Sequence, residues 1–488
     1  MMKNLGLAVT TVTLLSSASY ALAANQLETV MDLAFRDMID DGVEVTYDDR
    51  IIGGDGSVEY KNLVITDPSD ETIVSVAWIK GVPLASDPET VTFTMADTLT
   101  LSGEEDDAEF TLELRTSGMS LTTNAVLREA MSKDDVHVVF TADSFIVDGG
   151  DPDSEYLRKI FADLGGVDFN LLVTNGDSHV EGSLDAEKLD ISYDMTTDGD
   201  AQTTEQTTDS ISISFEFDIP EDEEDALGYL DGSKSAVVKM ESGKTVYDSS
   251  INADGLAFQM AGTSDSSTAF IEMTGGTFTY DVQAGAMDMT ITPGEGMPFP
   301  PTDISISGMT MKTIVPMNSA DEADEAVLNI LLADLTVGEG LWAMIDPDKT
   351  ISRDPATVDI DLEALVQIDP EVAIAGGDPI EMAVIHSLNI NQVLFEVAGA
   401  SAQADGAMTF NNDGPIPMPI GSVNIDVNGL STLSNHLVAL GLLDQMEAGM
   451  MMGMMMAFAK PGKKADQFVS EITFTEDGEI LANGQPIQ

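Results

Sequence analysis

Apolar and polar residues alternate with a period of two along most of the chain after residue 43. The clearest example is Ile-Ser-Ile-Ser-Phe-Glu-Phe at 211–217. Because successive side chains of a strand point to opposite faces of a sheet, such segments predict strands with one apolar face and one wet face. Turns that contain glycine or proline, for example at 53–56 and 67–70, separate these segments, so sequential strands are expected to pair antiparallel. The segments predicted as strands are 43–47, 58–65, 73–79, 91–101, 110–114, 136–140, 169–173, 189–193, 211–217, 237–240, 256–260, 270–273, 278–280, 287–291, 304–311, 358–362, 366–368, 388–397, 407–410, 423–427, 472–474 and 480–481.

Four segments are predicted as helices instead. Apolar residues recur at steps of three and four from Leu27 to Met38, just before Gly42, which predicts one amphipathic helix. Further helices are predicted at Ser154–Leu164, at Asp321–Met344 and in the apolar segment Leu433–Phe458. Acidic residues in the first turn of the third segment would oppose the positive pole of the helix dipole favourably.

These elements together predict a mainly β fold, a β-rich α+β arrangement. We expect a large, curved antiparallel sheet with an apolar face or groove and a few covering helices, because an apolar face must be covered by a sheet, by helices or by a ligand. A proline-rich break at 293–301 is the best internal boundary. It separates an N-terminal β-rich half, 24–292, from a C-terminal β-rich half with a closing helix, 302–488. The two halves are either separate domains or one continuous sheet.

The N-terminus has the pattern of a secretory signal peptide. Lys3 precedes an apolar core at 5–15, and Ala21-Leu22-Ala23 forms an A-x-A cleavage site. The apolar core is shorter than the roughly 20 residues that a spanning helix needs, and no cysteine is present to carry a lipid anchor. We therefore expect residues 1–23 to be removed, and the mature chain to be periplasmic, or secreted, without a transmembrane span.

The chain is strongly acidic, with 20 Lys and Arg against 86 Asp and Glu and a formal net charge of −66. This charge repels nucleic acid and anionic lipid headgroups, so no nucleic-acid partner is expected. The acids are spread along the chain, which favours a solvated surface adapted to salt over sites for divalent cations. The absence of cysteine from an exported chain excludes disulfides, thiol nucleophiles and Cys-ligated metals.

No catalytic or cofactor motif is present. The four histidines, at 137, 179, 386 and 436, are isolated in sequence, and there is no G-x-S-x-G, no P-loop and no G-x-G-x-x-G after a strand. The nearest candidate for calcium is 148–155, where four carboxylates fall in one loop without the spacing of an EF-hand. We favour a turn in which Asp153 or Ser154 caps a helix. The sequence thus predicts no catalytic residue, no metal site and no cofactor.

A run of methionines at 450–456 has three interpretations. The side chains fill a core, line an adaptable apolar surface, or supply thioethers to Cu(I). A helix distributes consecutive methionines around its circumference, which disfavours copper, and a core role is favoured. If the segment contacts an apolar ligand, the predicted contact residues are Met451, Met452, Met455, Phe458 and Trp342.

Arg353 is one of the few cations of the chain and lies in the segment Arg353-Asp354-Pro355. We expect it to pair with Asp346 or Asp354 and so to fix the turn between a helix and a strand. Contact with the headgroup of a ligand is the alternative.

Two regions of the second half carry a family resemblance. Residues 341–347 with 353–357, and the ending 457–462 with 481–485, resemble the exported alphaproteobacterial family 2125 of the domains of unknown function. That family is distantly similar to the AsmA-like envelope proteins, which implies a long curved β-sheet with an apolar groove involved in lipid handling or outer-membrane homeostasis. The resemblance implies no catalytic residues.

We therefore expect a non-enzymatic envelope protein that binds lipid or another apolar molecule in a β-groove, or an envelope protein partner. Two other classes stay open. A secreted acidic hydrolase would show convergent polar residues in a pocket, and a calcium-dependent surface or adhesion module would show carboxylates clustered in loops. A lipid binder would show a continuous apolar channel lined by Met, Leu, Ile and Phe.

Overall fold

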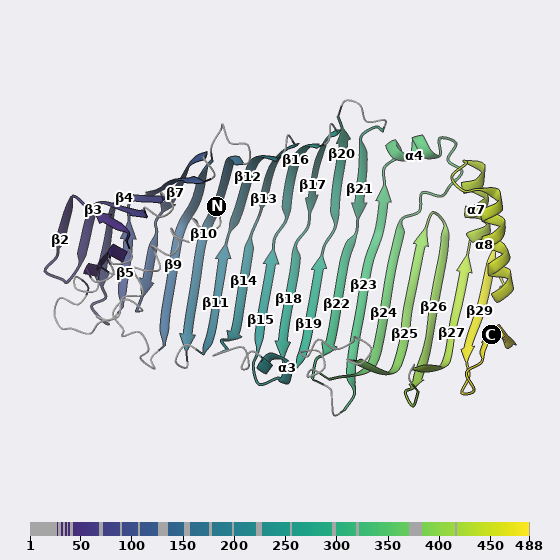
Figure 1. Cartoon of the computed structure of the whole chain (residues 1–488). Coiled ribbons are helices and arrows are strands. Elements are labelled where there is room, and N and C mark those ends of the chain that lie inside the picture. The colour runs from purple at the N-terminus through teal and green to yellow at the C-terminus, as the bar shows by residue number, and fades with distance from the viewer. Residues whose placement is uncertain are drawn as a thin grey trace. The chain divides into compact units, whose positions relative to one another are not determined.

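The structure is a computed structural model of the 488-residue chain (Figure 1). The chain divides into two compact units: unit 1 comprises residues 1–221 and 239–259, and unit 2 comprises residues 222–238 and 260–488. The residues that the structure describes are 27, 31–32, 35–36, 38–39, 42–67, 72–87, 90–105, 108–124, 135–150, 157–174, 178–197, 200–220, 227–253, 256–294, 299–318, 322–369, 383–414 and 417–487. The predicted signal peptide and most of the candidate calcium loop lie outside the described residues.

The prediction of a mainly β, antiparallel fold is confirmed, because strands make up most of each unit and every described pairing is antiparallel. In unit 1 the sheet runs from β1 and β2, which both pair with β3, through β4 to β10 and on to β16. Its strands are β1 (Glu44–Thr46), β2 (Asp49–Ile52), β3 (Val58–Asp67), β4 (Thr72–Pro83), β5 (Val91–Met95), β6 (Thr98–Glu105), β7 (Ala108–Ser117), β8 (Ser120–Thr123), β9 (Val136–Gly150), β10 (Leu157–Thr174), β11 (His179–Ala186), β12 (Lys188–Thr197), β13 (Asp200–Thr208), β14 (Ile211–Asp218) and β16 (Thr245–Ala253). Two strands, β15 (Ala236–Ser242) and β17 (Leu256–Ser264), contribute residues to both units.

Unit 1 has a closed hydrophobic core at the N-terminal end of its sheet. The described residues of the predicted N-terminal helix are helical, and their apolar side chains are buried against β3 to β8. The ring of Tyr60 on β3 is fully buried in this core, and its hydroxyl donates to Asp32 Oδ1 at 3.1 Å. Arg50 Nη1 donates to both carboxylate oxygens of Asp32, at 2.6 and 2.7 Å, which ties β2 to the helix. The buried helix residues are Leu27, Met31, Phe35 and Met38.

Several long strands of unit 1 are interrupted near their middle. β11 and β12 both pair with β10, and between them the amide of Glu187 donates to the carbonyl of Gly165 at 2.8 Å. A second break lies between β13 and β14, where the amide of Asp209 donates to the carbonyl of Lys244 at 2.9 Å. Gly166, beside the first break, has φ of 61°, a conformation that glycine adopts at no steric cost. Such bulges bend a strand and increase its twist.

Unit 2 is built on a second row of antiparallel strands. β19 pairs with β22, and from β22 to β27 each strand pairs with the next, after which β27 pairs with β29. Figure 1 shows these strands side by side. They are β18 (Ser267–Thr274), β19 (Thr277–Ala284), β20 (Met287–Pro293), β21 (Thr302–Ile306), β22 (Gly308–Pro316), β23 (Asp324–Val337), β24 (Ala356–Ile368), β25 (Ala383–Val397), β26 (Ala400–Asn411), β27 (Met418–Asn428), β28 (Lys460–Pro461), β29 (Gln467–Phe474), β30 (Ile480–Ala482) and β31 (Gln485–Pro486).

Mid-strand breaks recur in unit 2. The amide of Asp265 donates to the carbonyl of Ala286 at 2.8 Å, between β17 and β18 on one side and β19 and β20 on the other. The predicted strand 304–311 is in fact two strands, because Ser307 separates β21 from β22 and donates its amide to Ala333 at 2.9 Å. The proline-rich break that we predicted as a boundary lies inside unit 2, between β20 and β21, which pair with each other.

Two predicted helices are wrong, because both segments are central strands. Residues 157–174 form β10, which pairs with β9 on one side and with β11 and β12 on the other. Residues 324–337 form β23, between β22 and β24, and only 339–345 are helical. Short apolar runs do not distinguish a buried strand from a helix, and pairing on both edges decides the conformation here.

Besides the N-terminal helix of unit 1, the described residues form four labelled helices, all in unit 2. They are α3 (Gly228–Asp231), α4 (Glu339–Ile345), α7 (Leu430–Ala439) and α8 (Gln445–Phe458).

The predicted helix 433–458 is two helices rather than one. Gly441, with φ of 74°, follows the end of α7, and Asp444 caps α8 by accepting the amide of Met446 at 2.7 Å. The N-terminus of α7 is held by Asp466, which comes from later in the chain and accepts the amide of Thr432 at 2.8 Å. Burial raises the pKa of Asp466, but hydrogen bonds from Ser431 and Thr432 outweigh it, so the pKa is lowered.

Candidate functional site

The register of unit 2 aligns apolar side chains on one face of the sheet, which we call the apolar face. Directly paired residues of neighbouring antiparallel strands project from the same side. Ile330 of β23 pairs with Ile360 of β24, which pairs with Val393 of β25, and the series continues to Ile425 of β27. The three central rows are Leu328–Leu362–Ile390–Gly406–Val423–Ile472, Ile330–Ile360–Val393–Ala404–Ile425–Ser470 and Leu332–Val358–Phe395–Ala402–Val427–Phe468.

The opposite face of the same strands is largely polar, and its acids are paired with amide side chains. Asn329 donates to Asp361 at 2.7 Å across β23 and β24. Gln392 donates to Asp359 at 2.7 Å. Carboxylates that accept hydrogen bonds from neighbouring strands stabilise the sheet without binding a cation. The other pairs of this kind are Asn424 with Asp405 and Gln467 with Asp426.

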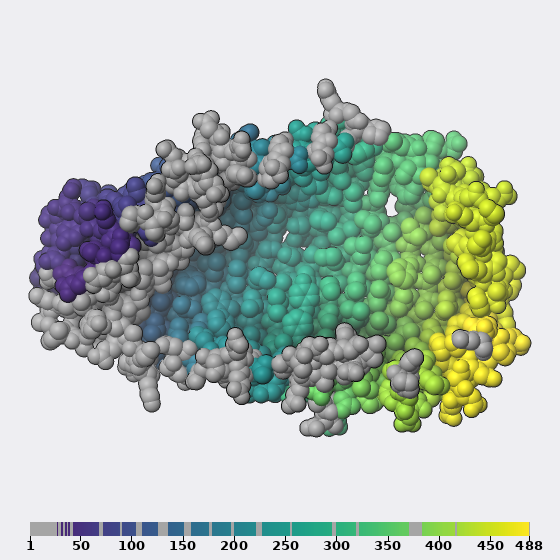
Figure 2. Space-filling model, viewed as in Figure 1, coloured from purple at the N-terminus to yellow at the C-terminus, as the bar shows by residue number. Residues whose placement is uncertain are grey.

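No apolar side chain of the three rows is buried. All are half-buried except Phe395, which is 47% exposed. The buried apolar residues described in unit 2 lie outside the three rows, at Ile351, Val366, Ile368, Ala400 and Ala482. Val366 and Ile368 continue the alternation of β24 beyond Leu362, so burial begins at that end of the strand. Figure 2 shows one face of this row of strands, and the C-terminal helices lie at the end of the row rather than over β23 to β26. Among the residues that the structure describes, no helix or second sheet covers the three rows, whereas an apolar sheet face is normally covered.

The methionines of α8 do not form a core, so the favoured sequence interpretation is wrong. No residue of α8 is buried. Met451, Met452 and Met455 are half-buried on the inner side of the helix, where the Ser431 hydroxyl of α7 lies 3.8 Å from the sulfur of Met452. Phe458, predicted beside them as a contact residue, is exposed. The methionines of α8 thus differ in exposure, from half-buried at Met451, Met452 and Met455 to exposed at Met450, Met454 and Met456.

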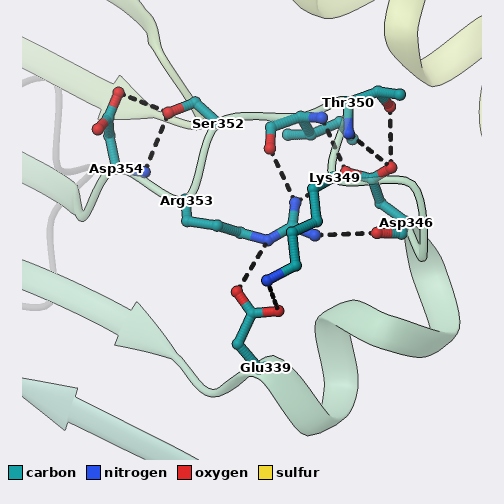
Figure 3. Close-up of polar contacts among 8 residues, drawn as sticks. Glu339, Asp346, Lys349, Thr350, Ser352, Arg353 and Asp354 are labelled. Carbon is teal, nitrogen blue, oxygen red and sulfur yellow. Dashed lines mark hydrogen bonds and ion pairs between the residues drawn. The ribbon is translucent and has the colours of Figure 1, made fainter.

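The turn after α4 is organised by Asp346, whose side chain is fully buried (Figure 3). Its carboxylate accepts the amide and hydroxyl of Thr350 at 3.0 and 2.8 Å and the amide of Ile351 at 2.8 Å. Thr350 donates to Oδ1, and Arg353 Nη1 donates at 2.8 Å to Oδ2, the oxygen that also accepts the Ile351 amide. Burial alone would raise the pKa of Asp346, but these hydrogen bonds hold it well below the usual range.

Of the two acids predicted as partners of Arg353, the structure places Asp346 against it and leaves Asp354 with Ser352, whose hydroxyl donates at 2.6 Å. A second acid that the sequence did not indicate, Glu339 of α4, approaches Arg353 Nε at 3.6 Å and Lys349 at 3.0 Å. The contact between Glu339 and Arg353 could not be predicted from the sequence. Glu339 was expected inside a long helix that starts at 321, whereas it lies in the first turn of the short helix α4.

Trp342 of α4 contacts this turn. The guanidinium carbon of Arg353 lies 4.3 Å from the centre of its ring, a cation–π contact. The structure thus groups Trp342 with Asp346 and Arg353, while Met452 of α8 contacts Ser431 of α7. The side chains that were predicted as one ligand-contacting set fall into two groups.

Unit 1 contains an open polar cavity of about 390 Å³. Its lining includes Lys159, Tyr193 and three acids, Asp194, Glu205 and Asp248. Gln259 donates to both oxygens of Asp248, at 2.8 and 2.9 Å. The cavity is open to water, and Gln259 holds Asp248, so we assign it no chemistry.

The described histidines and acids do not gather into a metal site. Among the residues that the structure describes, no group of three or more His, Asp or Glu side chains is placed to hold a metal ion. Asp148, the first acid of the candidate calcium loop, pairs with Arg115 at 2.6 Å. His179 lies between Asp218, at 2.9 Å, and Glu216, at 3.5 Å, at the end of the paired strands β11 and β14.

Comparison with protein-family models, with curated proteins and with solved structures gives no match. Within the described part of the chain, no helix has both the length and the apolar character needed to cross a bilayer.

Proposed function

We propose that the protein is a non-enzymatic component of the cell envelope, exported to the periplasm, that binds lipid or another elongated apolar molecule on the apolar face of unit 2. The observation that supports this is the set of aligned apolar rows across β23 to β29, none of whose apolar members is buried. Each square ångström of apolar surface left in water costs roughly 25 cal/mol. A bound apolar molecule removes that cost.

The dimensions of the rows suit a hydrocarbon chain. Six strands about 4.8 Å apart give each row a length of about 24 Å. The hydrocarbon core of a bilayer is about 30 Å thick, so one acyl chain of a leaflet extends about 15 Å. One acyl chain therefore fits along one row, and the neighbouring rows offer room for a second chain of the same lipid.

The test compares two lysine substitutions on opposite faces of the same strand pair. Phe395 of β25 is on the apolar face and pairs with Ala402, and Ser401, the neighbour of Ala402 on β26, points to the polar face. Phe395→Lys places a charge on the central row, whereas Ser401→Lys adds the same charge beside Glu396. Native mass spectrometry of each chain, purified from its own periplasm, with extraction of co-purifying lipid, measures occupancy.

We expect the native chain and Ser401→Lys to carry the same apolar ligand, and Phe395→Lys to lose at least tenfold of it while keeping its denaturation midpoint. A native chain without ligand, and unchanged after incubation with phospholipid vesicles, would rule the proposal out. Equal loss in both lysine variants would show that charge, rather than the apolar face, governs retention.

A further inference from the structure

The outer side of α8 is an exposed apolar stripe of unit 2. Met446, Met450, Met454 and Phe458 follow one another at intervals of four residues and are 75%, 63%, 57% and 44% exposed. Residues four apart lie on one side of a helix. Between Ala448 and Ala459 the sequence contains no polar side chain.

Small residues widen this stripe. At Gly449 and Gly453 a Cβ atom would meet nothing within 4 Å, so these glycines face open space rather than a neighbouring backbone. They therefore do not serve close packing inside unit 2. A solvent-facing helix ordinarily carries charged or polar residues on its outer side, and a helix that is apolar all round is buried in protein or in lipid.

Three lysines follow the helix directly. Lys460, Lys463 and Lys464 are all exposed, and they account for three of the 20 cationic residues in a chain with 86 acids. In the part of the chain that the structure describes, none of the three forms an ion pair, and Lys460 makes only a long hydrogen bond, 3.3 Å, to the carbonyl of Asn483. Cations so placed complement phosphate groups at the end of an apolar helix.

We propose that α8 and the three lysines form a docking element for the surface of a phospholipid bilayer, with the stripe Met446–Met450–Met454–Phe458 in the acyl boundary and the lysines at the lipid phosphates. This is the arrangement of an interfacial helix, in which apolar area and basic residues act together. The helix has 14 residues, about 21 Å of length, which suits lying in the interface rather than spanning it.

The net charge of the whole chain does not prevent this docking. At physiological ionic strength the Debye length is about 8 Å, so acids farther than that from the membrane are largely screened. In the proposed orientation the stripe and the lysines face the bilayer. The docking is independent of ligand binding on the apolar face, since it uses a different element of unit 2.

The experiment is flotation of the chain from Ala24 with vesicles of phosphatidylethanolamine and phosphatidylglycerol, and separately with vesicles of phosphatidylcholine. The test variant is Met450→Ser with Met454→Ser, and its matched control is Met344→Ser with Met418→Ser, which removes two methionines that are also exposed but lie outside α8. Met450→Leu with Met454→Leu keeps the apolar area.

We expect the α8 serine variant to reduce the bound fraction at least tenfold, and the control and the leucine variant to bind as the native chain does. Replacing Lys460, Lys463 and Lys464 by Gln should weaken binding to the anionic vesicles by about fivefold per charge and have little effect on phosphatidylcholine. Circular dichroism and Trp342 fluorescence check that each variant is folded.

Absence of native flotation with both vesicle types, or flotation unaffected by the α8 serine variant, would overturn the proposal. Sedimentation velocity tests whether a second copy of the chain occupies the stripe instead. In that case the native chain would be a dimer that does not bind vesicles, and the serine variant would be a monomer. Phe395→Lys distinguishes the two functions, because it should lose co-purifying lipid and still float.

Discussion

The N-terminal end of unit 1 and the strand row β22 to β29 of unit 2 use the same kind of strand in opposite ways. In unit 1 the helix that carries Leu27 and Met31 covers the apolar side of β3 to β8, and side chains such as Val58 and Leu101 are almost fully buried. In unit 2 the equivalent alternation produces aligned apolar rows that no described helix buries.

This difference shows that apolar alternation in a strand specifies a face and leaves its cover undetermined. A covered face adds stability to the chain, because packing against a second layer removes apolar area from water. An open face is available for a ligand. The polar anchors differ as well: in unit 1 the hydroxyl of the buried Tyr60 meets the half-buried pair of Arg50 and Asp32, whereas unit 2 buries the whole side chain of Asp346 in a turn.

The largest expected effect comes from opening the closed core of unit 1. Met31 is fully buried, so Met31→Asp places an unpaired charge among apolar side chains, which costs about 3–5 kcal/mol of unfolding free energy. The covering helix should detach from the sheet. Increased binding of a hydrophobic dye, together with a lower urea midpoint by Trp78 fluorescence, checks this. Unchanged dye binding would mean that the helix is not the cover.

A smaller effect separates the two surfaces directly. Leu101→Ala in the closed core should reduce the free energy of unfolding of unit 1 by about 3 kcal/mol, because it leaves a cavity. Ile360→Ala on the open face should cost unit 2 only about 1 kcal/mol, since no cavity forms. The chain has two tryptophans, Trp78 in unit 1 and Trp342 in unit 2, so variants that keep one of them report each unit. Equal costs would show that the face is covered.

The buried carboxylate of unit 2 should make stability depend on pH. Because the pKa of Asp346 is lowered in the folded chain, its charge stabilises the fold above the ordinary carboxyl value, and this contribution is lost as the pH falls through the lowered pKa. Asp346→Asn should lower the denaturation midpoint reported by Trp342 by less than Leu101→Ala lowers that of unit 1. The difference from the native chain should be full at neutral pH and shrink below pH 3.8. A difference that is constant with pH would contradict this.

The smallest expected effect concerns the polar anchor of unit 1. Tyr60→Phe removes one hydrogen bond to Asp32 and leaves the pair of Arg50 and Asp32 in place. We expect a loss of about 1 kcal/mol, typical of one hydrogen bond, measured by urea denaturation with Trp78. A loss as large as that of Leu101→Ala would show that the hydroxyl also holds the helix in position.

Local patterns were sufficient where a strand or helix depends mainly on its own residues. The alternation at 211–217 predicted β14, and the spacing from Leu27 to Met38 predicted a helix that is helical and buried in its described residues. They failed at 157–164 and 324–337, because pairing with strands on both edges made these apolar segments strands. Nearness in sequence predicted Asp346 or Asp354 as the partner of Arg353. The fold of the turn after α4 decided that the partner is Asp346.

The sequence by itself determined the mainly β class, the two-faced character of the strands, the acidity and the unusual apolar stretch after Asp444. Tertiary structure alone decided the register that aligns Ile330, Ile360 and Val393, the break between α7 and α8, and the exposure of the outer methionines. The physical reason is range: alternation and spacing are set within a few residues, whereas cover and alignment depend on which distant segments meet. The residues next to an apolar side chain in the sequence therefore do not determine whether it lies in a core or on an open surface.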